Sequence, residues 1–163
     1  MIRVWGNGAV CYQESINITD DSRHGCLCVR TIYGSTIFPW EWVNPPMESG
    51  IEYRTTERYL DKPVYCQVID CGVITAHTQK IVDKSIPVLD VLSCEGIIYT
   101  NSNGHNQATP FDYSNTNGTK YSVTVSAEAY EQSEEDRLSI YVNSSWAVTG
   151  SVHAIVRYTK ETD

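Results

Sequence analysis

Cysteine, histidine and carboxylate side chains are the residues of this sequence that could do chemistry. Cys66 and His77 could form a thiol nucleophile and its base, but Cys66 lies within an alternating run, where a thiol is packed rather than activated. Asp83, Asp90 and Glu95 are close in sequence and could be the paired carboxylates of a glycosidase. Without a fold that positions them, this spacing indicates solvated charge at strand edges. Motifs such as GxSxG, HExxH and the P-loop are absent, so we expect no enzyme, no catalytic residue and no cofactor.

The cysteines could instead form disulfides or a metal site. They are Cys11, Cys26, Cys28, Cys66, Cys71 and Cys94. Most lie in alternating runs, where a free thiol behaves as a small apolar residue. The first residues carry no secretory-signal pattern, so we expect a reducing compartment and buried free thiols, with one or more disulfides as the alternative. Cys26 and Cys28 are too close together for a zinc knuckle and no histidine pair lies nearby, so we expect no metal site.

A long polar stretch at 100–119 is the candidate for recognition. It reads TNSNGHNQATPFDYSNTNGT. Amide and hydroxyl side chains supply the donors and acceptors that sugars need, and an aromatic ring can pack against the apolar face of a pyranose. Long polar loops in compact domains often carry function, although a plain solvated hairpin tip is the alternative. The candidate ligand-binding residues are Asn103, His105, Asn106, Phe111, Tyr113 and Asn115.

These side chains must be positioned by β-strands, because short alternating runs dominate the sequence. The runs are 26–33, 64–71, 87–100, 121–127, 137–143 and 152–159. Leu138, Ile140 and Val142 share one face of their run, so one side of that strand is expected to meet a core. The acidic stretch 126–137 has too few apolar residues for a packed helix, and we expect a turn or loop there. The whole pattern predicts an all-β sandwich or barrel.

Proline marks a boundary near residue 45. Pro45 and Pro46 cannot belong to a central strand, because proline lacks the backbone donor and restrains the preceding residue. Trp40 and Trp42 precede them and are interpreted as packing anchors. We therefore expect a small β module at 1–50, a connector at 51–62 and a β-sandwich at 63–163.

Charge and hydropathy exclude two classes of partner. The formal net charge is −8 and no lysine or arginine cluster is present, so we expect no nucleic-acid partner. No apolar run approaches the roughly 20 residues that span a bilayer, so we expect no membrane insertion.

The segment 44–72 resembles a segment of tail-fibre and receptor-binding proteins from bacteriophages and prophages of Gram-positive gut bacteria. Those proteins share a W-x-N-P-P-M motif, then E-Y-x-T-T-E, then G-K-P-V-Y, and a strand ending near D-x-G. The matching residues are Trp42, Asn44, Pro45, Pro46, Met47, Glu52, Tyr53, Thr55, Thr56, Glu57, Lys62, Pro63, Val64, Tyr65, Asp70 and Gly72. Asp61 stands where the motif has glycine, and the AIVRYTKETD end is similar to the terminus of the same proteins.

The resemblance implies a C-terminal fibre head with a jelly-roll-like sandwich, preceded by part of a knob-like module. It also implies a homotrimer at the tip of a virion's tail fibre, made in the bacterial cytoplasm, that contacts other tail proteins and attaches to a host-surface carbohydrate or wall polymer. The family supplies no catalytic set, and no site residue is transferred from it. The alternative is a purely structural fibre-tip or trimerisation domain without its own ligand.

Overall fold

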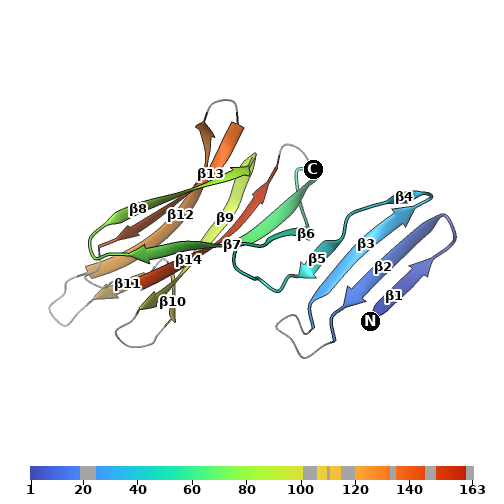
Figure 1. Ribbon diagram of the computed structural model, residues 1–163, viewed down its shortest axis with the longest axis horizontal. Helices are drawn as coiled ribbons and strands as arrows, with labels where there is room; N and C mark the ends of the chain where they lie inside the picture. Colours follow the sequence, from blue (N-terminus) through green and yellow to red (C-terminus); the bar gives the residue numbers. More distant parts are fainter. Residues whose placement is uncertain are drawn as a thin grey trace.

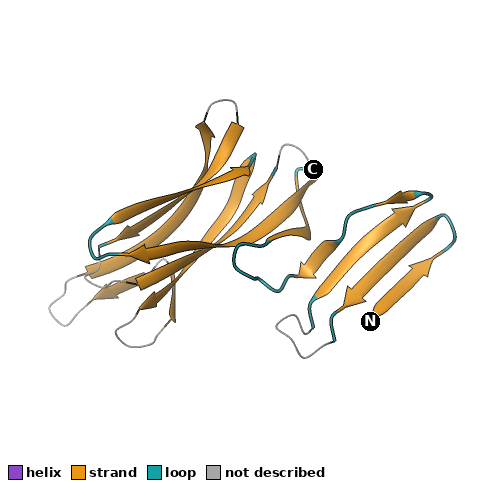
Figure 2. Ribbon diagram, viewed as in Figure 1, coloured by secondary structure: helices purple, strands orange, loops and turns teal. Residues whose placement is uncertain are grey.

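The computed structural model describes residues 1–18, 25–100, 106–109, 111–114, 120–132, 135–145 and 150–160. Every regular element within these residues is a β-strand, as Figure 2 shows, and the predicted all-β class is confirmed. The strands are β1 (Ile2–Gly6), β2 (Val10–Ile16), β3 (Leu27–Tyr33), β4 (Thr36–Ile37), β5 (Glu41–Asn44), β6 (Glu52–Tyr59), β7 (Lys62–Ile74), β8 (Gln79–Pro87), β9 (Asp90–Thr100), β10 (Asn106–Thr109), β11 (Phe111–Ser114), β12 (Lys120–Gln132), β13 (Glu135–Ser144) and β14 (Gly150–Thr159).

Strands β1–β5 form the part of a ten-stranded sheet that lies at one end of the molecule (Figure 1), and we call this part the small sheet. β1, β2 and β3 are antiparallel neighbours, and β4 and β5 both pair with the edge of β3 that β2 leaves open. Gly8 (φ 89°) and Gly34 (φ 57°) occupy left-handed positions in the turns that follow β1 and β3, a conformation that glycine adopts without steric cost. This sheet is a single layer, because every residue of β1 is exposed.

The head is a sandwich of two sheets. One is the rest of the ten-stranded sheet, in the order β6-β7-β14-β9-β10, and the other is a four-stranded sheet in the order β11-β12-β13-β8. Alternation builds the core, because Val152, Ala154 and Val156 on β14 are fully buried and so are the inward residues of β13. Those inward residues are Leu138, Ile140 and Val142, as the sequence predicted. The β-sandwich is thus confirmed. Its jelly-roll-like description stays a prediction. In the described residues, β9–β10 and β11–β12–β13 are consecutive hairpins, each within one sheet.

The residues expected to form a connector, 51–62, contain β6 and the turn into β7. Leu60 (φ 47°) and Asp61 (φ 63°) are both left-handed, which is the geometry of a two-residue type I′ hairpin turn. The glycine that the motif has in place of Asp61 would adopt that conformation without strain. The chain between the modules is therefore the segment from Pro45 to Ile51, and β5 also pairs in parallel with β6 through Trp42 and Thr55.

Two stretches that were expected to be turns or loops contain β-strands in the described residues. The acidic stretch 126–137, expected as a turn or loop, forms the end of β12 and the start of β13, paired from Ala127 opposite Ile140 to Gln132 opposite Glu135. The side chains that alternate along it include small ones, Ala127 and Ala129, which pack against the core. The polar stretch 100–119 contains the short strands β10 and β11, so hydrogen-bonded backbone occupies part of the expected loop.

Candidate functional site

Several side chains considered for catalysis make structural contacts instead. Cys66 is buried on β7, where its Sγ lies 3.9 Å from Met47 Sδ, and burial raises the pKa of the Cys66 thiol. A thiol with a raised pKa is a poor nucleophile at neutral pH. Asp83 accepts a hydrogen bond from Ser139 at 2.7 Å, and Asp90 accepts one from Thr159 at 3.4 Å, so both carboxylates link neighbouring strands. The absence of enzymatic activity stays a prediction.

All six cysteines are free, and three of them, Cys26, Cys66 and Cys71, are buried. Burial raises the pKa of the Cys94 thiol to about 11. No cluster of three or more histidine, cysteine and acidic side chains in the described part of the chain could hold a metal ion. Nor does that part contain a helix long and apolar enough to cross a membrane.

β10 and β11, the described strands of the polar stretch predicted to bind a ligand, lie on the side of the sandwich away from β1–β5 (Figure 1). Asn103, His105 and Asn115 lie outside the described residues. The backbone of Asn106 begins β10 and pairs with Tyr99 of β9. Phe111 and Tyr113 belong to β11, where they pair with Val123 and Tyr121 of β12.

A shallow cavity of about 320 Å³ lies on β7, β14 and β9. Its aromatic wall is Tyr99, whose ring meets the His153 imidazole edge-on with centroids 5.4 Å apart. Met47 and Ser49, from the proline-rich segment, close its other side. Sequence reasoning missed Tyr99 and His153, because the alternation of β9 and β14 shows which residues share a face but not which face is hollowed.

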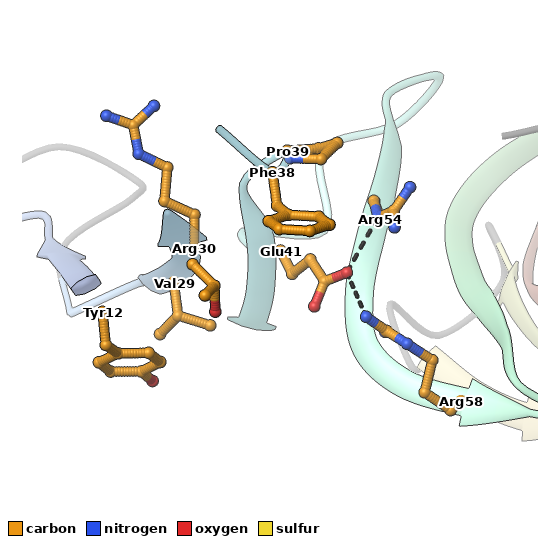
Figure 3. A pocket seen from close by; sticks show the side chains of 9 residues that line it. Tyr12, Val29, Arg30, Phe38, Pro39, Glu41, Arg54 and Arg58 are labelled. Atoms are coloured by element: carbon orange, nitrogen blue, oxygen red, sulfur yellow. Dashed lines mark hydrogen bonds and ion pairs between the residues drawn. The ribbon is translucent and has the colours of Figure 1, made fainter. Parts of the chain in front are cut away.

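A second cavity, of about 350 Å³, lies where the small sheet meets the head (Figure 3), and we call it the junction pocket. It is lined by Tyr12, Val29, Arg30, Thr31, Phe38, Pro39, Glu41, Arg54 and Arg58. These residues come from β2, β3, β5, β6 and the segment between β4 and β5. Cross-strand register brings them together, because Tyr12 is opposite Thr31 and Val29 is opposite Glu41, and directly paired residues share a face.

Glu41 is the electrostatic centre of the junction pocket. Its Oε1 accepts a bond from Arg54 Nε at 3.0 Å and another from Arg58 Nη2 at 2.5 Å, as Figure 3 shows. The parallel pairing of Trp42 with Thr55 explains this meeting, because it sets the preceding residues Glu41 and Arg54 at the same level. Two guanidinium groups thus share one carboxylate.

Arg30 lines the junction pocket differently. It pairs with Gln13 across β2 and β3, on the face opposite to that of Tyr12, and its Nε donates to Gln13 Oε1 at 2.7 Å. Its guanidinium lies 4.4 Å from the centre of the Trp40 ring, a cation–π contact. Figure 3 accordingly shows its guanidinium turned away from Glu41. The cations that face the pocket are therefore Arg54 and Arg58.

Comparisons with known proteins give structural neighbours only. The chain matches no protein-family model and no curated protein sequence. It is similar to a C-terminal fragment of the R2 pyocin fibre of P. aeruginosa, with 10% identity and a TM-score of 0.37 over 96% of this chain. It is also similar to an N-truncated R2-type pyocin tail fibre, with 11% identity and a TM-score of 0.34 over 96% of this chain and 80% of that one. The chain spans about half of the first neighbour, 55% of its length, and neither TM-score is high enough to establish a common fold.

Proposed function

We propose that this chain is the terminal, receptor-binding part of a bacteriophage tail fibre and attaches the virion to a host-surface glycan or wall polymer. The observation that carries the proposal is the sequence resemblance over 44–72 and at the C-terminal end. The fold supports it, because a single-layer module is followed by a β-sandwich whose strands β10 and β11, from the polar stretch, lie on the side away from that module. In this arrangement the module continues toward the fibre shaft and other tail proteins, while the head faces the host.

We further propose that the chain acts as a homotrimer. The small sheet leaves large apolar side chains exposed on both faces, including Ile2, Val4, Trp5, Ile37 and Phe38. Large apolar side chains exposed in this number favour an interface, and three copies around an axis would cover them. Three weak carbohydrate sites on one particle would then bind a repetitive cell surface with useful avidity.

Adsorption to host cells tests the receptor-binding function. Labelled protein is mixed with a panel of Gram-positive gut bacteria, the hosts to which the resemblance points, and bound protein is measured before and after chemical removal of surface polysaccharide. We expect saturable binding to some strains that is lost with the polysaccharide and weakened by Phe111→Ala or Tyr113→Ala. Light scattering gives the oligomeric mass of each variant, so that loss of binding can be separated from loss of assembly.

A purely structural fibre tip is the second candidate, and the exposed apolar surface of the small sheet is the observation that favours it. Such a tip predicts a stable trimer that adsorbs to none of the strains. That combination of results would replace the receptor-binding proposal with this one.

A further inference from the structure

We propose that the shallow cavity on β7, β14 and β9, which we call the Tyr99 cavity, binds an N-acetylated hexosamine unit. The Tyr99 cavity is lined by Met47, Ser49, Val68, Ile97, Tyr99, His153 and Ile155. This inference deepens the receptor-binding function and rests on it for the choice of a saccharide as ligand. Three features of the cavity support it: an exposed aromatic ring, an aliphatic wall, and two polar groups beside that wall.

The Tyr99 cavity lies on the side of its sheet that faces away from the core. Alternate residues of β14 are fully buried in the core, so His153 and Ile155, which stand between them, point to the opposite side. His153 is paired with Ile97 of β9, and directly paired residues share a face. Ile155 is paired in the same way with Val68 of β7. Tyr99 follows Ile97 by two residues on β9 and therefore belongs to this face as well.

Tyr99 supplies a platform for the sugar ring. It is 37% exposed, and its ring meets the His153 imidazole edge-on, with centroids 5.4 Å apart and planes at 83°. A pyranose carries several C–H groups on one side of its ring, and an aromatic face is a surface on which they pack. A cavity of about 320 Å³ has room for one monosaccharide unit.

The aliphatic wall selects the substituent on the sugar. Met47, Val68, Ile97 and Ile155 form this wall and are half-buried, and none of the described lining residues is an aspartate, glutamate, lysine or arginine. A charged ligand would lose hydration there without gaining a partner of opposite charge, so a neutral ligand is favoured. A hydroxyl group against the wall would likewise lose its hydrogen bonds to water, whereas the methyl of an acetamido group would bury apolar surface. An N-acetylated sugar therefore fits this wall better than an unsubstituted hexose.

One side of the cavity is held in place by the chain between the two modules. Met47 is left-handed, at φ 58°, a conformation that a residue with a side chain keeps only where the surrounding structure fixes it. Its Sδ lies 3.9 Å from Cys66 Sγ. Ser49 forms a parallel bridge with Val68, and the N–H of Gly50 donates to the carbonyl of Val68 at 2.8 Å. Because these contacts already fix the segment, little of it has to be ordered when a ligand binds.

Two polar groups beside the wall suit the amide of an acetamido group. Ser49 is exposed, and its hydroxyl can both donate and accept. His153 is half-buried, and its buried Nδ1 has no hydrogen-bond partner in the described residues. The partner of one imidazole nitrogen sets which nitrogen carries the proton, so an unpartnered Nδ1 leaves Nε2 able to donate or to accept. The amide N–H and C=O of the ligand need one acceptor and one donor, which these two side chains provide.

NMR titration of the full chain with three neutral sugars tests the site. The probes are N-acetylglucosamine and N-acetylgalactosamine, which carry the acetamido group, and glucose, which lacks it. We expect at least one N-acetylated sugar to bind at least about fourfold more tightly than glucose, the factor expected from burying one methyl group. Saturation-transfer difference spectra should show the strongest transfer at its acetyl methyl, because the proposal places this group against the aliphatic wall.

Matched variants locate the binding. Tyr99→Ser should weaken the N-acetylated sugar at least about tenfold, because the sugar ring loses its aromatic platform. Tyr59→Ser is the control, because Tyr59 is a tyrosine of similar exposure, 42%, on β6 outside the cavity. His153→Phe keeps a ring but removes both nitrogens, and it should also weaken binding. Val68→Thr places a hydroxyl in the wall and should reduce the preference over glucose, a readout that a loss of stability would not change. Far-UV circular dichroism and thermal melting verify that each variant is folded.

The proposal is wrong if neither N-acetylated sugar binds, if glucose binds as tightly, or if binding is unchanged in both Tyr99→Ser and His153→Phe. Adsorption to host cells that continues although neither sugar binds would remove this site and leave the receptor-binding function standing. Sugar binding that is retained while the chain adsorbs to none of the strains would refute the receptor-binding function and leave the Tyr99 cavity as a saccharide site.

Discussion

Replacing Glu41 by glutamine tests how the small sheet is held against the head. The Glu41 carboxylate on β5 binds Arg54 and Arg58 on β6, and β5 otherwise meets β6 through the single registered pair Trp42 and Thr55. Glutamine keeps the size and one acceptor oxygen but removes the charge. The two guanidinium groups would then lack their shared carboxylate partner.

The magnitude follows from the exposure of each partner. Breaking a fully buried ion pair costs about 3–5 kcal/mol, whereas an exposed pair contributes about 0.2–1 kcal/mol. The Arg54 pair is mostly buried and the Arg58 pair is partly exposed, at 17% and 42% for the two arginine side chains. Because glutamine retains a hydrogen-bond acceptor, we expect Glu41→Gln to lower the free energy of unfolding by about 1–3 kcal/mol.

Urea denaturation followed by tryptophan fluorescence measures this loss. Trp5, Trp40 and Trp42 lie in the small module and only Trp146 lies beyond it, so the signal is weighted toward the part that Glu41 holds. Double-mutant cycles with Arg54→Gln and Arg58→Gln give the two coupling energies, and the Arg54 coupling is expected to be the larger. Glu128→Gln is the control, because this exposed glutamate pairs only with Tyr141 in the described residues, and its loss should change stability by less than about 0.5 kcal/mol.

An unchanged urea midpoint in Glu41→Gln would refute the reasoning, since the carboxylate would then contribute nothing to holding the modules together. A larger coupling to Arg58 than to Arg54 would also contradict it, because burial would not be what strengthens the pair.

Three further predictions follow from single contacts. Asp61→Gly should stabilise the chain by about 0.5–1 kcal/mol in urea denaturation, because glycine adopts the left-handed turn conformation at φ 63° without strain. A loss of stability would show that the Asp61 side chain contributes more free energy than its backbone strain costs. Tyr158→Phe should cost about 1–2 kcal/mol in thermal melting, since the buried hydroxyl donates to Glu52, and a neutral result would mean that the bond contributes nothing net. The contribution of Cys94 to stability should be constant up to about pH 9 and fall between pH 9 and 11, because burial raises the pKa of this thiol from 9.0 to about 11 and the folded state therefore favours the protonated form. Cys94→Ala should make the fall in stability over this range less steep, and an unchanged slope in urea denaturation would exclude this thiol as a cause.

The core of the head could be predicted from the sequence, and the junction could not. Leu138 and Val156 lie in long runs whose apolar residues alternate, so a period of two identified the buried face before any contact was known. β6 was missed because its sequence, EYRTTERY, is charged, and only Tyr53 and Thr55 of that strand are buried. Period-2 patterns identify strands through buried apolar side chains, and a strand with so few of them resembles a connector.

The two candidate sites also differ in how well the sequence predicts them. A cavity such as the junction pocket requires Tyr12, Glu41 and Arg58 to meet across β2, β5 and β6, and only register determines that meeting. The available signal was the RTTER run, whose arginines stand four residues apart on one face of a strand. The polar stretch 100–119 was easier to identify, because its composition alone distinguishes it from the surrounding strands.

The residues that carry the resemblance explain why it indicates an architecture but no ligand. In the structure they hold backbone: the Tyr53 hydroxyl accepts a bond from the N–H of Glu48, Thr55 Oγ1 donates to the carbonyl of Val64, and Asp70 Oδ1 accepts the N–H of Gly72. Gly72 is left-handed, at φ 68°, where β7 shifts register against β14. A sequence motif made of such contacts preserves the turn between two modules whatever the head binds. Ligand specificity must then come from residues outside the motif.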